Sequence, residues 1–227
     1  MMHSFERLER IIGLEKVSLL QDKSVLILGC GGVGGYVCEA LARSGIGTII
    51  LVDYDVVCES NINRQIVALR STIGRKKVEV LAERVNDINE NCRVIVVDEF
   101  INNDNFLNLF QFNIDYFVDA CDTVLVKKLV IKECLKRNIK FISCMGTGNK
   151  LDPSKLEITD IRKTVNDPLA RILRKFVKNE KINKKIMVLS SKELPIKTGN
   201  RVPGSSAFVP SSAGLLIASY IVRDFIK

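Results

Sequence analysis

The sequence is poor in the residues that serve several common chemistries. It has one histidine, His3, and no tryptophan among its 227 residues. Histidine is the side chain used most often for acid–base catalysis, so a mechanism built on histidine is not expected. His3 is predicted to be a solvated residue of the N-terminal tail. No two cysteines have the Cys-x-x-Cys spacing of a structural zinc site, which predicts that the protein holds no zinc.

The seven cysteines are an odd number, and several lie in apolar strand or helix contexts. We therefore expect reduced, mostly buried thiols. No cysteine follows Cys144, so the C-terminal part of the chain cannot supply a cysteine nucleophile. The cysteines are Cys30, Cys38, Cys58, Cys92, Cys121, Cys134 and Cys144.

Long hydrophobic runs are also missing. No window approaches the ~20 apolar residues that a membrane-spanning helix needs. The first residues, MMHSFERLERIIG, mix acids with bases and have no apolar signal-peptide core. We expect a protein that has no membrane span and stays in the cytoplasm.

Positive charge is in excess and unevenly spread. The chain has 34 Lys and Arg against 26 Asp and Glu, a formal net charge of +8. The segment 171–185 is strongly basic, and Glu180 is its one acid. Such a segment either attracts a polyanion such as nucleic acid or forms a solvated helical face, and charge alone leaves both open. Its basic residues are Arg171, Arg174, Lys175, Lys178, Lys181, Lys184 and Lys185.

The order of the apolar segments predicts an α/β fold. A short apolar run at 24–29, a helix at 33–44 and a second apolar run at 48–53 form a βαβ unit. The same alternation then continues, which predicts a Rossmann-like, doubly wound and mainly parallel sheet. The further elements are helices at 75–89 and 124–137 and strands at 93–99, 115–120 and 140–144.

Beyond Gly148 the pattern changes. We expect one domain over 1–227, made of a nucleotide-binding core (1–150) and a C-terminal extension (151–227). The extension is predicted to contain strands at 155–161 and 186–191, a basic helix at 167–179, a mobile loop rich in Pro, Gly and Ser at 195–206, and an apolar helix at 210–225 that docks on the sheet.

A glycine-rich loop follows the first predicted strand and opens a helix. Its glycines, Gly29, Gly31, Gly32 and Gly34, match the pattern GxGxxG. In this context the backbone can turn tightly and approach a phosphate at the helix N-terminus. Asp53 ends the next strand, where a carboxylate can bind ribose hydroxyls. The arrangement indicates an adenine nucleotide, and it fits NAD as well as ATP.

The residues after Asp53 favour ATP. A triphosphate needs dispersed positive charge, amide donors and an acid that can hold magnesium. A nicotinamide site needs a flat apolar pocket, so an NAD-dependent oxidoreductase is the weaker alternative. Arg64 and Lys77 taken singly also fit plain surface cations, and a nucleotide-binding scaffold without activity is a further alternative. The polar residues in question are Asp55, Asn61, Asn63, Arg64, Gln65, Lys77 and Asp122.

Four segments together resemble the ubiquitin-activating-enzyme-like (ThiF, MoeB and HesA) adenylating superfamily. They are GCGGVGGYVCEALARSGIG, VDYDVVCESNINRQ, GRKKVE and DACDT, and this resemblance covers roughly residues 5–150. SNINRQIVALRSTIG, LAERVNDINENCRVIVVDEF, LEITDIRKTVNDPLARILRK and PGSSAFVPSSAGLLIAS resemble the tRNA threonylcarbamoyladenosine dehydratases within it. With them the resemblance covers nearly the whole chain.

The resemblance implies roles for individual residues. Gly31 and Gly34 would cradle the nucleotide, and Asp53 would bind its ribose. Asp122 would coordinate magnesium, and Arg10 would reach the triphosphate across a homodimer interface. Asp55 matches an acid of the superfamily without a defined role. The phosphates would be held by Asn61, Arg64, Gln65 and Lys77.

The implied reaction is the adenylation of the threonyl carboxylate of threonylcarbamoyladenosine in tRNA. Ring closure would follow, with release of AMP and pyrophosphate. The nucleophile is then the substrate's own carbamoyl group, so the lack of cysteine after Cys144 is no obstacle. The alternative is an activator of a small ubiquitin-like sulfur carrier, which commonly adds a Cys-x-x-Cys zinc site or a loop cysteine. The participation of a sulfur-transfer partner protein stays open.

Overall fold

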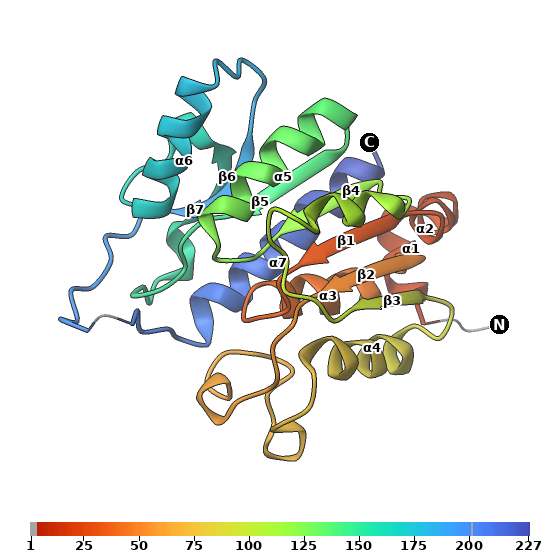
Figure 1. Cartoon of the computed structure of the whole chain (residues 1–227). Coiled ribbons are helices and arrows are strands. Elements are labelled where there is room, and N and C mark those ends of the chain that lie inside the picture. The colour runs from red at the N-terminus through yellow and green to blue at the C-terminus, as the bar shows by residue number, and fades with distance from the viewer. Residues whose placement is uncertain (1–3, 201) are drawn as a thin grey trace.

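The computed structural model describes residues 4–200 and 202–227, so His3 lies outside the described residues. A seven-stranded sheet has the strand order β3-β2-β1-β4-β5-β7-β6, and helices cover both of its faces (Figure 1). Six strands run parallel, and only β6 is antiparallel to its neighbour β7. The predicted Rossmann-like, doubly wound fold is confirmed. The strands are β1 (Ser24–Leu28), β2 (Thr48–Val52), β3 (Arg93–Val97), β4 (Tyr116–Asp119), β5 (Lys140–Cys144), β6 (Leu156–Asp160) and β7 (Met187–Ser191).

The helices connect the strands in the expected alternation. The helices are α1 (Glu6–Ile12), α2 (Leu14–Gln21), α3 (Gly34–Arg43), α4 (Lys77–Ile88), α5 (Val124–Arg137), α6 (Pro168–Asn179) and α7 (Phe208–Phe225). Short 3₁₀ segments are η1 (Glu59–Asn61), η2 (Arg70–Thr72), η3 (Phe106–Gln111), η4 (Pro153–Lys155) and η5 (Ile161–Lys163).

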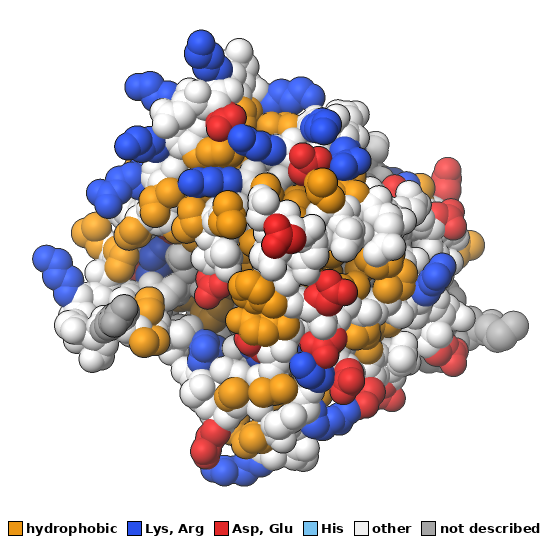
Figure 2. Space-filling view, viewed as in Figure 1, with side chains coloured by type: hydrophobic (Ala, Val, Ile, Leu, Met, Phe, Trp, Pro, Cys, Tyr) orange, Lys and Arg blue, Asp and Glu red, His pale blue; other side chains and the backbone are white. Residues whose placement is uncertain are grey.

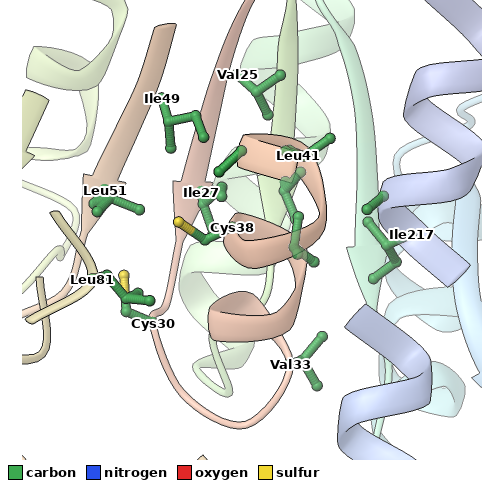
Figure 3. Close-up of a cluster of buried hydrophobic side chains, with 14 of the residues drawn as sticks. Val25, Ile27, Cys30, Val33, Cys38, Leu41, Ile49, Leu51, Leu81 and Ile217 are labelled. Carbon is green, nitrogen blue, oxygen red and sulfur yellow. The ribbon is translucent and has the colours of Figure 1, made fainter. Parts of the chain in front are cut away.

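The central strands are apolar on both faces because both faces are buried. In β1, Val25 and Ile27 pack with α3, α4 and α7, whereas Leu26 and Leu28 pack with α5 and α6 on the other face. Figure 3 shows Cys38 of α3 beside these strands and Ile217 of α7 on the far side of α3. The helix α3 is thus enclosed between the sheet and α7, which fixes the glycine loop at its N-terminus.

The C-terminal segment contains the two predicted strands, and the structure places both of them in the central sheet. Strand β7 pairs with β5 through Ser143 and Val188, and β6 lies outside it, so both strands continue the same sheet. The docking helix begins at Phe208, two residues before the predicted start at 210, and contains Pro210. A proline is tolerated there because the first turn of a helix has no intrahelical partner for its N–H groups.

The loop predicted at 195–206 is held at both ends by Asn149. The backbone N–H of Ile196 donates to the Asn149 carbonyl at 2.7 Å. The N–H of Asn149 donates to the Gly204 carbonyl at 2.8 Å, and the N–H of Gly204 donates to Oδ1 of Asn149 at 2.6 Å. These hydrogen bonds hold the two ends of the loop, Ile196 and Gly204, against the turn that follows β5. The two ends form the neck of the loop.

All seven cysteines are free thiols, as predicted. Cys58 is exposed, Cys121 is half-buried and the other five are buried. Burial raises the pKa of Cys92 to about 11 and that of Cys144 to about 12. No helix within residues 4–200 and 202–227 is long and apolar enough to cross a membrane.

A buried carboxylate joins α3 to α4. Glu39 accepts hydrogen bonds from Nε of Arg43 at 2.7 Å and from Nε of Arg84 at 2.5 Å. Burial acts to raise the pKa of Glu39, but the hydrogen bonds and charges of the two arginines outweigh it and lower the pKa. A group whose pKa is lower in the folded state stabilises the fold above its unfolded pKa, and this stabilisation is lost as the pH falls through the folded pKa.

We expect Glu39→Gln to lower the free energy of unfolding by about 1–2 kcal/mol at neutral pH, because charge-assisted hydrogen bonds are lost. Urea denaturation of both proteins measures the difference. The difference should begin to shrink as the pH falls below about 4.3, the pKa of a glutamate in an unfolded chain, and continue to shrink towards the lower folded pKa. A difference that is unchanged from pH 7 to pH 3 would show that the charge of Glu39 is not the cause.

Candidate active site

A cavity of about 330 Å³ opens where the carboxyl ends of β1, β2 and β4 meet. In open α/β sheets, ligands bind at this edge, where the strand order changes direction. The structure brings most of the predicted site residues together there. Those that line the cavity are Gly29, Gly31, Asp53, Asp55, Asn61, Arg64, Gln65, Lys77 and Asp122.

The glycine loop depends on two close approaches between backbone segments. Gly29 has a φ of +95°, and a Cβ there would lie 2.8 Å from the carbonyl carbon of Ala120. A Cβ on Gly34 would lie 1.8 Å from the carbonyl oxygen of Gly29. Gly34 therefore serves the packing of α3 against the end of β1, and it lies outside the cavity lining, as does Gly32.

The carboxylate of Asp53 fastens the glycine loop to the end of β2. Its Oδ2 accepts from the backbone N–H of Cys30 at 2.6 Å, and its Oδ1 accepts from the N–H of Asp55 at 2.8 Å. A carboxylate has about four acceptor sites, so Asp53 keeps capacity for ribose hydroxyls.

Four amide and cationic side chains reach the cavity from the crossover after β2 and the start of α4, namely Asn61, Arg64, Gln65 and Lys77. Lys77 is buried, and its Nζ lies 2.7 Å from Oδ2 of Asp55. Arg64 donates from Nη1 to the Ser60 carbonyl at 2.8 Å and to Oδ1 of Asn63 at 2.9 Å. The buried oxygen Oε1 of Gln65 has no hydrogen-bond partner among the described residues, so this amide can still accept from a ligand.

Asn63 is predicted from the sequence to be an amide donor of the site, but its side chain makes a contact elsewhere. Its Nδ2 donates to the carbonyl of Ser205 at 2.9 Å, which connects the crossover to the neck of the 195–206 loop. It lies outside the cavity lining, in contrast to its neighbours Arg64 and Gln65.

The cavity also has an apolar wall, which no sequence motif indicates. Tyr54 and Phe100 meet edge to face with ring centroids 4.8 Å apart, and Ile101 follows them in the lining. Leu28, Val52 and Val126 complete this wall. An apolar wall beside the carboxylate of Asp53 suits a flat base. The available signal was the position of Tyr54 two residues after β2 and of Phe100 three residues after β3.

The charge on the cavity wall is net negative. The carboxylates Asp53, Asp55, Glu99 and Asp122 face two cations, Arg64 and Lys77. The pKa of Tyr54 is raised, chiefly by the negative charge of Asp55. A triphosphate therefore needs further positive charge from outside this set of residues.

One source of that charge is magnesium. Asp122 is an exposed carboxylate at the cavity, and magnesium is commonly held by one or two carboxylates together with substrate phosphates. No group of three or more His, Cys, Asp and Glu in the described parts of the chain forms a metal cluster by itself. The donor set fits a metal bridged by the nucleotide rather than an all-protein site.

Arg10 lies on α1, outside the cavity lining, and forms an ion pair with Glu6 at 2.5 Å. About 66% of its side chain is exposed.

The basic segment 171–185 does not form one surface around the cavity. Arg171 and Arg174 lie near Asp167, which accepts from the N–H of Gly146 just after the carboxyl end of β5. Lys184 and Lys185 instead lie beside Tyr116 and Lys140, which begin β4 and β5 at the opposite edge of the sheet.

The exposed charges of α6 share one face. Arg171, Lys175 and Lys178 are exposed at helical spacing i, i+4, i+7. Arg174 is half-buried and donates from Nη1 to the carbonyl of Thr164 at 2.8 Å, and Lys181 follows the helix. Figure 2 shows Lys and Arg side chains gathered along the edge of the molecule over α6.

The fold, the glycine loop at a helix N-terminus and the polar cluster after β2 define a nucleotide-binding enzyme of the adenylating type. The ThiF family model matches residues 5–182, and the chain belongs to the ThiF family.

Within that family, the chain is similar over its full length to the tRNA threonylcarbamoyladenosine dehydratases, as the sequence resemblance predicted. It is 43% identical to the protein of that name from Bacillus subtilis, with 100% of this chain and 96% of that protein covered. The protein of the same name from Escherichia coli is 43% identical over 75% of this chain and 64% of its own length. The crystal structure of the E. coli enzyme, TcdA, in complex with ATP has a TM-score of 0.92 at 36% identity, with 98% and 93% of the chains covered.

Proposed function

We propose that residues 1–227 form a single ThiF-type domain that acts as an ATP-dependent dehydratase on tRNA in the cytoplasm. It adenylates the threonyl carboxylate of N6-threonylcarbamoyladenosine and drives its cyclisation, with release of AMP and pyrophosphate. The observation that carries this proposal is the cavity, where Asp53, Arg64, Gln65 and Lys77 surround the glycine loop. The Bacillus subtilis relative, which matches over the full chain and is named for this reaction, supports it.

The first step makes the carboxylate reactive. A carboxylate oxygen attacks the α-phosphorus of ATP, and the bond from this phosphorus to the pyrophosphate oxygen breaks. The base would lie against Tyr54 and Phe100, and the ribose would meet Asp53. Arg64 and Lys77 would stabilise the charge that develops on the departing pyrophosphate. Asn61 and Gln65 would add amide contacts to the phosphates.

Magnesium and a second copy of the chain would supply the positive charge that the cavity lacks. Asp122 would hold the metal together with phosphate oxygens, and the metal neutralises phosphate charge when bound. Arg10 is exposed and lies outside the lining of its own cavity, so we assign it to the cavity of the partner in a homodimer. The role of Asp55 is to orient Lys77, its ion-pair partner.

The second step needs no nucleophile from the protein. The carbamoyl group attacks the adenylated carbonyl carbon, the bond to AMP breaks, and the carbamoyl group loses one proton. Cys121 lines the cavity, but burial and then the charge of Asp119 raise the pKa of its thiol, so the thiol stays protonated. The attack is intramolecular, and such reactions reach effective molarities of ~10⁵–10⁸ M. Covalent catalysis by the protein is therefore unnecessary.

The tRNA would approach over α6. The face that carries Arg171, Lys175 and Lys178 begins near the carboxyl edge of the sheet, where the cavity also opens. It has no exposed aromatic residue for base stacking, so contacts with the phosphate backbone are expected. Lys184 and Lys185, at the opposite edge, are expected to contribute less.

A matched pair of charge reversals tests this surface. We expect Lys175→Glu/Lys178→Glu to raise the Kd for tRNA at least about tenfold, because two phosphate contacts become repulsive. Lys184→Glu/Lys185→Glu changes the net charge equally and should have a smaller effect. Filter binding at two salt concentrations measures both, with ATP affinity as a control. Equal losses in the two variants would mean that only the net charge of the protein matters.

Pyrophosphate release from ATP tests the function itself. The protein is given tRNA that carries threonylcarbamoyladenosine or the same tRNA without the modification, and the nucleoside mass is then measured. Release with the modified tRNA alone, together with loss of one water from the nucleoside, is the expected result. Indifference to both tRNAs would contradict the proposal, and a carrier protein ending in Gly-Gly would then be the next substrate to test.

A further inference from the structure

A buried ion pair lies beside the cavity wall after β4. Lys127 and Asp119 both have 0% exposed side chains, and Nζ of Lys127 lies 3.0 Å from Oδ1 of Asp119. The same Nζ donates to the carbonyl of Cys144 at 2.8 Å. The pair therefore connects the end of β4, the first turns of α5 and the end of β5.

These contacts bracket one loop. Asp119 is the last residue of β4, and Lys127 is the fourth residue of α5, so the loop 120–123 runs between the two charges. All four residues of this loop line the cavity, and Asp122 is among them. Within the loop, Sγ of Cys121 donates to Oδ1 of Asp119 at 3.1 Å. The contacts of Lys127 hold both ends of the loop beside the sheet, and the Cys121 contact adds a third attachment within it.

The free-energy cost of burying Lys127 and Asp119 suggests that the pair serves the geometry of the loop more than the stability of the fold. Removing two charges from water is costly, and a buried ion pair is often no more stable than apolar residues of similar volume. Burial acts to lower the pKa of Lys127, but Asp119 and neighbouring groups outweigh it and raise the pKa, so the lysine stays charged. What the pair provides beyond stability is a fixed distance between the two ends of the loop.

We infer that Lys127 is a positioning residue, which holds the loop 120–123 and thereby the carboxylate of Asp122 where the triphosphate and magnesium meet. This inference rests on the proposed ATP site. It concerns the shape of the loop and not a contact between Lys127 and the nucleotide, because Lys127 lies outside the cavity lining.

The chain offers a matched comparison in a second buried lysine–aspartate pair. Nζ of Lys150 lies 3.8 Å from Oδ2 of Asp167 and donates to the carbonyl of Gly146 at 2.8 Å. These side chains are only 2% and 1% exposed. This pair joins the same two residue types in a buried setting, at a longer distance than the 3.0 Å of Lys127 and Asp119, and it does not bracket a loop that lines the cavity.

The experiment compares Asp119→Asn/Lys127→Met with Lys150→Met/Asp167→Asn. Each double variant removes both charges, so neither leaves an unpaired buried ion, and Asn at 167 keeps the acceptor that caps α6. Calorimetry measures the Kd of a non-hydrolysable ATP analogue with and without magnesium, and the Kd of AMP. Thermal unfolding is recorded for every protein.

In the wild-type protein, magnesium is expected to tighten the binding of the analogue. In Asp119→Asn/Lys127→Met this gain should fall about tenfold, while the Kd of AMP and the melting temperature stay close to wild type. The Lys150→Met/Asp167→Asn protein should keep the full gain. If the first double variant does not fold, Lys127→Arg replaces it, because the larger guanidinium keeps the charge but displaces the loop, and the same loss is expected.

The inference would be overturned if magnesium tightened analogue binding by the Asp119→Asn/Lys127→Met protein as much as by the wild type. The same result in Lys127→Arg, if that variant has to replace the double variant, would also overturn it. Equal losses in the two double variants would also overturn it, because the effect would then be general loosening. Failure of the wild-type protein to bind the analogue, or to respond to magnesium, would instead contradict the proposed ATP site.

Discussion

Replacing Lys77 with alanine is expected to slow pyrophosphate release by about 10²–10³-fold, because one cation that stabilises the departing pyrophosphate is lost. Among the described residues, two cations line the cavity, Lys77 and Arg64, against four carboxylates. Its loss leaves Arg64 alone. The fold should survive because Asp55, the ion-pair partner of Lys77, has a side chain that is 45% exposed and can be hydrated when unpaired.

The measurement is a coupled pyrophosphate assay with modified tRNA, accompanied by thermal unfolding. Arg70→Ala is the control, because Arg70 lies on the same crossover with 86% of its side chain exposed and is outside the cavity lining. Wild-type turnover in the Lys77→Ala enzyme would remove Lys77 from the ATP site. Loss of activity together with a large fall in melting temperature would indicate a structural role only.

Two glycines of the same loop should fail in different ways when replaced with alanine. In Gly34→Ala the new Cβ would lie 1.8 Å from the carbonyl oxygen of Gly29, so two backbone segments must separate. We expect a loss of about 3 kcal/mol or more in the free energy of unfolding, because backbone atoms cannot turn away as a side chain can.

In Gly31→Ala the nearest atom to the new Cβ is Nε2 of Gln65 at 3.8 Å, so the fold has room for it. Gly31 lines the cavity, however, and the methyl group would occupy the space through which a phosphate approaches the backbone. We expect near wild-type stability and an ATP affinity at least about tenfold weaker. Urea denaturation and calorimetry separate the two cases. Normal ATP affinity in a stable Gly31→Ala protein would place the phosphates elsewhere.

The central part of the fold was predictable because its strands are buried on both faces. A strand such as β1 has no polar face, so its five residues form a continuous apolar run. The helices α1 and α2 were not predicted, since they span only 7 and 8 residues, less than the window in which a helical stripe is recognised. The position of β7 between β5 and β6 depends on pairing between distant segments, which a local pattern does not encode.

The polar part of the site was predictable for a related reason. Asp53 and Asp122 follow parallel strands, and the carboxyl ends of such strands meet at one edge. Lys127 was not identified because, in sequence, it is one of several lysines on an ordinary helix. Lys127 is buried because its Nζ lies against the ends of β4 and β5, and this contact is visible only in the folded structure. The opposite holds for Lys184 and Lys185, which are close to Arg171 in sequence and lie at the other edge of the sheet.

The packing of α7 against α3 affects the order in which the nascent protein folds and becomes able to bind ATP. A Cβ on Gly214 of α7 would lie 2.5 Å from the carbonyl oxygen of Val33, and Pro210 lies against Gly32, so α7 touches the glycine loop itself. Strands β1 to β5 can pair while the ribosome is still adding residues. The loop acquires its last neighbour only when α7 has emerged. Nascent chains stalled before residue 208 should therefore form much of the sheet and yet hold ATP poorly.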